Sequence, residues 1–77
     1  MTLWDLQQGS ASEVASLSDQ LQANYRTRLI ELGFKPGERI TCVLAPRLGA
    51  PRLYQVDNTV FSLDDQLARH IQLHPAA

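Results

Sequence analysis

The sequence YRTRLIELGFKPGERITCVL, residues 25–44, contains the signals that decide the fold. Gly33 directly follows the last apolar residue of a helical pattern, where glycine can take the left-handed conformation that ends a helix. Pro36 and Gly37 suit the two central positions of a type II turn, because proline presets φ and glycine accepts a positive φ. The stretch therefore predicts a helix that a tight corner joins to a strand.

The strand after this corner has the alternation of a half-buried strand. Ile40, Cys42 and Leu44 are expected to point to one side and Thr41 and Val43 to the other. We therefore predict that Cys42 is a small buried hydrophobic residue. A thiol in such surroundings is a poor nucleophile unless a neighbouring cation lowers its pKa.

Composition restricts the class of protein. A chain of 77 residues forms one small domain, which we expect to span residues 1–77. No apolar run approaches the ~20 residues that cross a bilayer, and no basic segment precedes an apolar one as in a signal peptide. The single cysteine suits a reducing cytosol, and the formal charge of −1 argues against a nucleic-acid partner.

The helix before the corner is predicted to begin near Ser18 or Asp19, either of which can cap its first turn. Its apolar side chains recur at helical spacing and form one stripe. The members of the stripe are Leu21, Tyr25, Leu29 and Leu32. Asn24 is a candidate interruption that would give two short helices. Arg26 and Arg28 fall off the stripe and are expected to be largely solvated.

The other segments read as short strands separated by turns. Strands are predicted at residues 11–17, 52–56, 59–63 and 71–74, and residues 3–6 as a short strand or an extended entry. Asp64 and Asp65 are predicted to cap a single helical turn over residues 66–69, and residues 75–77 to be a tail. The fold class is therefore mainly β, a small barrel closed on itself with a short helical insertion between early strands.

The chain offers little for catalysis or metal binding. His70 and His74 are four residues apart, which is metal-ligand spacing on a helix, but the segment between them reads as a strand and no third ligand is evident. We expect no enzymatic activity, no catalytic or metal site and no cofactor. A metal-sensing variant that acts through Cys42, His70 or His74 remains an alternative.

The chain resembles the FeoA family, the small SH3-like accessory proteins of bacterial ferrous iron transport. The central motif is Arg-x-x-Leu-x-x-Leu-Gly-hydrophobic-x-Pro-Gly, which matches residues 26–37. Weaker matches follow in order along nearly the whole chain. They are residues 3–6 with Gly9, Ala45-Pro46, residues 49–51, residues 61–63, Ala68 and Ile71.

This resemblance implies an SH3-like β-barrel with a helical insertion. It also implies a non-enzymatic protein of the cytoplasm that reaches the inner membrane only through its partner. That partner would be FeoB, a membrane ferrous-iron transporter with a cytosolic G-domain, which proteins of this family are thought to bind and modulate.

Leu29 is the first candidate for partner contact, because it matches the apolar helix position of the central motif; the alternative is that it only packs the helix on the barrel. Arg26 and Arg28 flank it and could add electrostatic complementarity. Arg47 and Leu48 lie in a loop bounded by prolines and form the alternative contact. Gly33, Pro36 and Gly37 are assigned to backbone geometry only.

Other functions stay open at this point. The runner-up is a stand-alone SH3-like interaction domain of the iron-dependent-repressor type that acts with a metalloregulator. A small nucleic-acid-binding barrel is a third class, which the near-neutral charge disfavours. Weak homo-oligomers could form through the helix face or an incompletely closed sheet edge.

Overall fold

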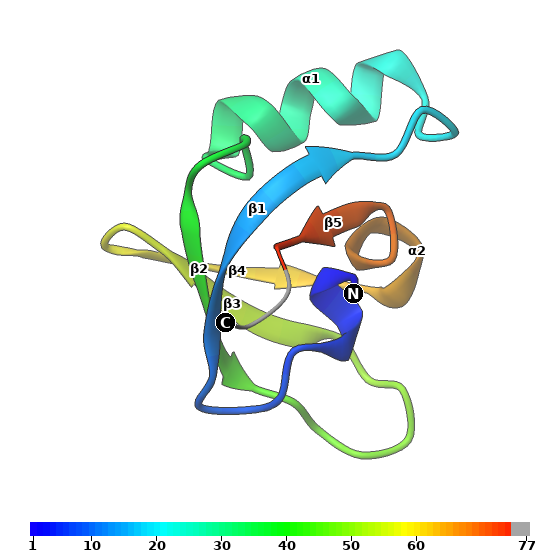
Figure 1. The fold of residues 1–77 in the computed structure, drawn as a ribbon. Helices are drawn as coiled ribbons and strands as arrows, with labels where there is room; N and C mark the ends of the chain where they lie inside the picture. Colours follow the sequence, from blue (N-terminus) through cyan, green and yellow to red (C-terminus); the bar gives the residue numbers. More distant parts are fainter. Residues whose placement is uncertain (75–77) are drawn as a thin grey trace.

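Five antiparallel strands form one strongly curved sheet in the computed structural model, which describes residues 1–74 (Figure 1). The elements in chain order are η1 (Leu3–Asp5), β1 (Ala11–Leu17), α1 (Ala23–Leu32), β2 (Arg39–Leu44), β3 (Arg52–Val56), β4 (Thr59–Leu63), α2 (Asp65–Ala68) and β5 (Ile71–Leu73). The predicted tail, residues 75–77, lies outside the described part. The predicted mainly-β class with a helix inserted between the first two long strands is confirmed.

The long strand β1 makes the curvature possible. Its first half pairs with β2, from Ala11 opposite Thr41, and its second half pairs with β5, from Val14 opposite Leu73. The register shifts between Val14 and Ser16, and such an irregularity bends a strand and increases its twist. One strand therefore serves two parts of the curved sheet.

The sheet order β4-β3-β2-β1-β5 leaves β4 and β5 as its two edges. The chain passes from one edge strand to the other through the helical turn α2. The barrel is thus not closed by hydrogen bonds between its edge strands in the described part of the chain. This corrects the expectation of a barrel closed on itself.

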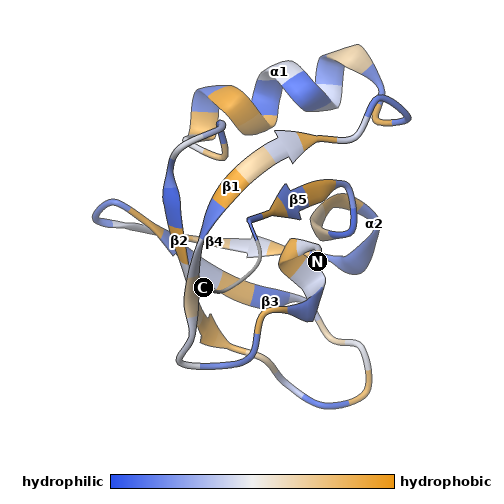
Figure 2. Cartoon of the chain, viewed as in Figure 1, coloured by the Kyte–Doolittle hydropathy of each residue, from blue (hydrophilic) through white to orange (hydrophobic). Residues whose placement is uncertain are grey.

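Side chains from every strand and from α1 fill the interior. Phe34 is fully buried and meets the half-buried Phe61 edge to face, with ring centroids 5.7 Å apart. Cys42 is fully buried in this core, as predicted. Figure 2 shows the apolar residues alternating with polar ones along the strands, which is the pattern that places one face inward.

The corner after α1 has the predicted geometry. Gly33 has φ +111°, its N–H donates to the Ile30 carbonyl oxygen at 3.0 Å, and the Phe34 N–H donates to that of Leu29 at 2.9 Å. These two bonds form a Schellman motif, which satisfies carbonyl groups that the helix leaves free. Gly37 follows with φ +92° in the predicted tight turn.

The start of α1 is later than predicted. The helix begins at Ala23, and its N-cap residue, Gln22, makes no side-chain capping bond. Ser18 instead closes a separate turn, in which its carbonyl oxygen accepts from the Leu21 N–H at 3.2 Å and its hydroxyl from the Gln20 N–H at 3.2 Å. A serine satisfies a local turn by the same bonds that cap a helix, so sequence alone did not separate the two.

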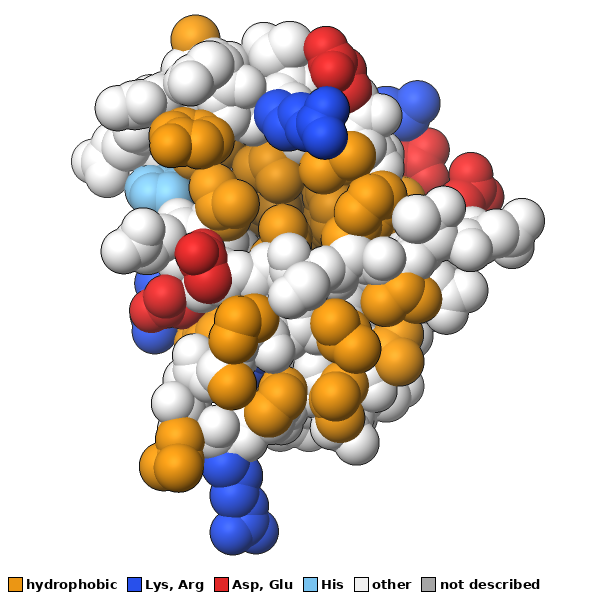
Figure 3. Space-filling model, turned by 180° about the vertical axis from the view of Figure 1, so that it is seen from behind, with side chains coloured by type: hydrophobic (Ala, Val, Ile, Leu, Met, Phe, Trp, Pro, Cys, Tyr) orange, Lys and Arg blue, Asp and Glu red, His pale blue; other side chains and the backbone are white. Residues whose placement is uncertain are grey.

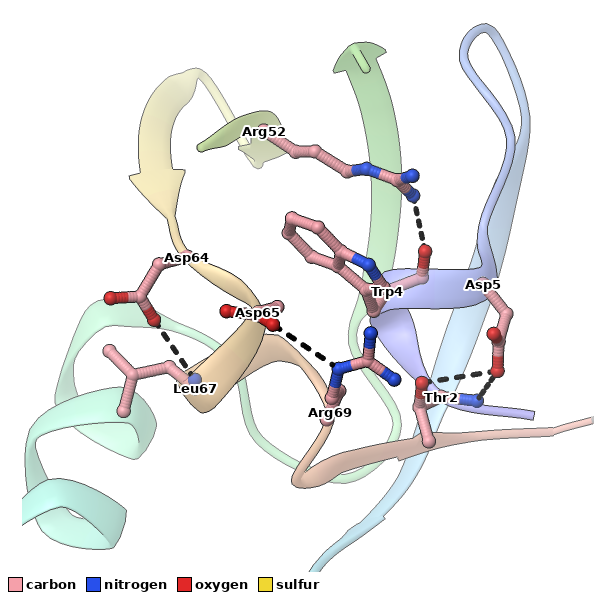
Figure 4. A network of polar contacts seen from close by, with 8 residues as sticks. All are labelled: Thr2, Trp4, Asp5, Arg52, Asp64, Asp65, Leu67 and Arg69. Atoms are coloured by element: carbon pink, nitrogen blue, oxygen red, sulfur yellow. Dashed lines mark hydrogen bonds and ion pairs between the residues drawn. The ribbon is translucent and has the colours of Figure 1, made fainter. Parts of the chain in front are cut away.

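The entry to the chain is a 3₁₀ helix rather than a strand. The Asp5 carboxylate accepts from the Thr2 N–H at 2.9 Å and from the Thr2 hydroxyl at 3.1 Å (Figure 4). The hydrogen bond from the Thr2 backbone holds the pKa of Asp5 below its usual value. This reciprocal cap stabilises a turn where apolar spacing suggested an extended segment.

Leu44 also departs from the predicted alternation. The register between β2 and β3 shifts between Cys42 and Leu44, so Leu44 turns outward and is exposed. A bulge adds one residue to one strand and reverses the side-chain phase beyond it.

The helical turn after β4 confirms the predicted cap. Asp64 Oδ1 accepts from the Leu67 N–H at 3.1 Å (Figure 4). The helix covers Asp65–Ala68, one residue earlier than predicted, and it buries Ala68.

Replacing Gly33 by alanine should lower the free energy of unfolding by about 2 kcal/mol or more, because it adds positive-φ strain and a steric clash. A Cβ at this position would lie 2.7 Å from Val56 Cγ1, whereas one at Gly37 would meet nothing within 4 Å. Gly37→Ala is therefore the matched control, which should lower the free energy of unfolding by only about 1 kcal/mol through backbone strain. Urea denaturation of both variants measures the difference, and equal losses would contradict the close packing at Gly33.

Candidate partner-binding surface

The loop between β2 and β3, residues 46–51, carries the most exposed apolar side chain of the described chain. Leu48 is fully exposed and has φ +66°, a left-handed conformation that is uncommon for a non-glycine residue. Gly49 follows with φ +73°. An apolar residue held in this conformation at a loop tip presents its whole surface to solvent.

Both ends of this loop are tied to the body. At its start, the Ala45 N–H donates to Gln8 Oε1 at 3.0 Å. At its end, the Arg52 guanidinium donates to the Trp4 carbonyl oxygen and lies over the Trp4 ring, 4.2 Å from the centroid (Figure 4). The loop therefore has fixed ends and an exposed tip.

Trp4 stands between two arginines. The Arg69 guanidinium lies 5.9 Å from the ring centroid and pairs with Asp65 at 3.5 Å (Figure 4). Each cation near the aromatic ring contributes about 0.5–1 kcal/mol at such partly exposed sites. Trp4 thus connects η1, the end of the loop and α2.

Tyr54 anchors the same region from inside the core. Its side chain is fully buried, and its hydroxyl donates to the Leu3 carbonyl oxygen at 3.2 Å. Burial raises the pKa of Tyr54 to about 12, with a smaller opposing contribution from the nearby Arg52. The phenol must stay protonated to donate this bond, so the anchor depends on a neutral Tyr54.

The structure corrects the assignment of Leu29 as a contact residue. Its side chain is only 2% exposed and is part of the core. It is the one buried residue of α1 and occupies the position of the Schellman motif that packs against the residue after the helix. The apolar position of the central motif therefore holds the helix on the barrel.

The other residues of the predicted helix surface differ in accessibility. Arg28 is exposed, as expected. Arg26 is half-buried instead of largely solvated, because its Nη2 donates to the Ser18 carbonyl oxygen at 2.7 Å and lies 3.8 Å from Asp19 Oδ1. Tyr25 was predicted to lie on the buried stripe but is 49% exposed.

The two predicted contact regions do not form one surface. α1 lies at one end of the molecule, and the loop of residues 46–51 lies at the other (Figure 1). A single small partner surface could cover either Arg26 and Arg28 or Arg47 and Leu48, but not both.

A groove that sequence reasoning missed lies between the turn before α1 and α2. Its volume is about 570 Å³. The lining residues are Gln20, Leu21, Gln22, Tyr25, Asp64, Gln66, Leu67, Arg69 and His70. The view from behind shows apolar side chains gathered around a hollow in the surface (Figure 3). The only sign of this groove in the sequence was the apolar spacing that placed Tyr25 on the helix stripe.

The titratable side chains give no catalytic or metal-binding geometry within residues 1–74. No group of three or more His, Cys, Asp or Glu residues there is placed to hold a metal ion. His70 lines the groove, whereas His74 Nε2 lies 3.8 Å from Glu13 Oε1. Burial raises the pKa of Cys42, so its thiol is a weak nucleophile.

Residues 1–75 match the family model of the FeoA domain. FeoA of Stenotrophomonas maltophilia, solved in complex with zinc and proposed as a ferrous iron transport activating factor, is 38% identical. Its TM-score is 0.84, with 96% of this chain and 89% of that chain covered. FeoA of Chlorobium tepidum is 26% identical with a TM-score of 0.86, and the match covers 100% of this chain and 71% of that one.

A manganese-dependent transcriptional repressor shares the fold. Its TM-score is 0.81 at 18% identity, and the match covers 92% of this chain and 39% of that chain. No match was found among curated proteins. The predicted SH3-like class is thus confirmed by solved relatives.

Leu29→Ala should lower the free energy of unfolding by about 3 kcal/mol, because truncating a buried leucine removes apolar contacts and leaves a cavity. Urea denaturation measures this change. Ile30→Ala on the exposed side of the same helix is the control and should cost less than about 1 kcal/mol. A Leu29→Ala variant as stable as the wild type would show that this side chain is not part of the core.

The stability of the fold should fall as pH rises from 10 toward 12. The ordinary tyrosine pKa of 10.0 is raised to about 12 in the folded protein. The neutral phenol therefore stabilises the fold fully below pH 10, and this contribution is lost as pH rises through the folded pKa. Tyr54→Phe should give a flatter profile over this range in urea denaturation, and an unchanged slope would contradict the assignment.

Proposed function

Because this chain belongs to the FeoA domain family, we propose that it is a non-enzymatic accessory protein that regulates ferrous iron uptake by binding the cytosolic part of an FeoB-type transporter. The family match over residues 1–75 carries this proposal. The 38% identity to the Stenotrophomonas maltophilia protein, itself proposed as a transport activating factor, supports it. No helix within residues 1–74 is long and apolar enough to cross a membrane.

We assign the contact to the loop of residues 46–51. Burying one fully exposed leucine contributes about 1.5–3 kcal/mol, and Leu48 is presented without any intramolecular contact to break. The ties at Ala45 and Arg52 fix the ends of the loop, which lowers the entropy lost on binding. Arg47, which is exposed beside it, would direct the loop toward an acidic surface.

The α1 end is the weaker candidate surface. Its apolar motif residue, Leu29, is buried, and Arg26 is engaged with Ser18 and Asp19. Arg28 remains available, but a single exposed arginine contributes mainly to association rate and specificity. The helix surface would therefore tune an encounter rather than anchor it.

In this proposal the protein works in the cytoplasm and reaches the inner membrane only through the transporter. It needs no cofactor and no nucleic acid. The second candidate, a stand-alone interaction domain for a metalloregulator, is supported by the fold shared with the manganese-dependent repressor. The family match favours the transporter, because it extends over residues 1–75.

Leu48→Asp should weaken binding to the soluble cytosolic domain of the transporter at least tenfold, because it places a charge where an apolar side chain is to be buried. Isothermal titration calorimetry, with and without guanine nucleotide, measures the affinity. Leu48 makes no contact with the core, so urea denaturation should show unchanged stability.

The matched comparison is Arg28→Glu at the far end of the molecule, which should change the affinity only slightly. Weaker binding to the transporter domain in Arg28→Glu alone would show that the contact lies on α1 instead. Absence of binding by the wild-type protein in every nucleotide state would contradict the transporter domain as the partner.

A further inference from the structure

The two edges of the sheet are protected to different degrees. At β5, the Leu73 N–H donates to the Met1 carbonyl oxygen at 2.8 Å, and Thr2 forms a bridge with Gln72. The N-terminal residues therefore cover this edge. At β4, no hydrogen bond from residues 1–74 reaches the strand on the side away from β3. The sheet thus has one covered edge and one open edge in the described chain.

The open edge lacks the features that usually block edge-to-edge pairing. β4 has the sequence TVFSL, without a charged residue and without proline. Its pairing with β3 is continuous from Val56 opposite Thr59 to Arg52 opposite Leu63, so no bulge twists it away. Charges, prolines and bulges are the usual protections of an exposed edge strand. Val60, at 49% exposure, adds an apolar side chain.

We propose that β4 is a self-association edge, which pairs antiparallel with β4 of a second copy of this chain around a two-fold axis. The strand is compatible with itself, because a pairing centred on Phe61 places Val60 opposite Ser62 of the second copy, and the five residues of the strand carry no charge that would repel its counterpart. The two sheets would then form one continuous sheet across the axis.

The outward face of the sheet supports the same occupant. Leu53 on β3 lies opposite Ser62 on β4 and opposite Leu44 on β2, so these residues form one row across three strands. Leu44 is exposed and Leu53 is half-buried. In the pairing centred on Phe61, each row continues through Ser62 to the exposed Val60 of the second copy, so apolar side chains of both copies lie on one face of the joined sheet.

The asymmetry of the edges sets the size of the assembly. A chain with two open edges would add copies without limit, whereas one open edge closes after a single isologous contact. Because β4 has only five residues, the interface is smaller than the ~1,200 Å² of a stable complex. We therefore expect a dimer with a dissociation constant in the micromolar range or weaker.

Sedimentation equilibrium of the wild-type chain over concentrations of about 10 μM to about 1 mM tests the dimer. Ser62→Lys should weaken association at least tenfold, because it places a charge at the edge and brings like charges close across the axis. The matched control is Gln55→Lys, which adds the same charge at an exposed position of the interior strand β3. This control should change the association by less than threefold.

Amide hydrogen exchange, followed by NMR at low and high concentration, locates the contact. Protection that rises with concentration at Val60 and Ser62 supports pairing through β4. A monomer at every concentration overturns the proposal. An equal loss of association in Ser62→Lys and Gln55→Lys also overturns it. Protection of these amides only when the transporter domain is added would also overturn it, since the edge would then accept a strand of that partner.

This proposal does not depend on the transporter as a partner. Leu48 lies in the loop between β2 and β3, whereas Ser62 lies on β4. Loss of transporter binding in Leu48→Asp with intact dimers, or loss of dimers in Ser62→Lys with intact binding, distinguishes the two interfaces.

Discussion

The close approach of the Gly33 backbone to Val56 is the constraint on which the rest of the fold depends. A residue with a side chain at this point would meet Val56 Cγ1, and the left-handed turn would also be strained. The turn ends α1, buries Phe34 and delivers the chain into β2. Through β2 it sets the position of β1 and β3, the two neighbours of that strand.

The parts of the fold that depend on local chemistry could be predicted from the sequence. The glycine stop, the Pro-Gly turn, the Asp64 cap and the main strands follow from backbone preference and side-chain alternation. The errors had different sources. The Ser18 turn is closed by the same local bonds that cap a helix, and the bulge before Leu44 depends on the pairing with β3, which periodicity does not reveal. Leu29 lies on the predicted apolar stripe, so its burial agrees with periodicity, and only the motif match made it a contact candidate.

The candidate binding surface combines fixed ends with an exposed tip. Arg52 contributes twice, since its guanidinium donates to the Trp4 carbonyl oxygen and lies over the Trp4 ring. Sequence reasoning identified the loop from its prolines and arginine, but it could not identify the contacts of Arg52 with Trp4 and of Tyr54 with Leu3, whose partners are 48 and 51 residues apart along the chain. It also placed Tyr25 in the core, although this residue lines the groove beside α1.

The buried Cys42 has a consequence for how the opening of this fold can be followed. Its thiol is the only one in the chain, it is fully buried, and its pKa is raised by that burial. The thiolate is the form that attacks an alkylating reagent, and it meets the reagent only when the core opens. Its alkylation rate therefore reports the population of open molecules. A second cysteine placed at a surface position could be labelled first, while Cys42 stays protected in the native state.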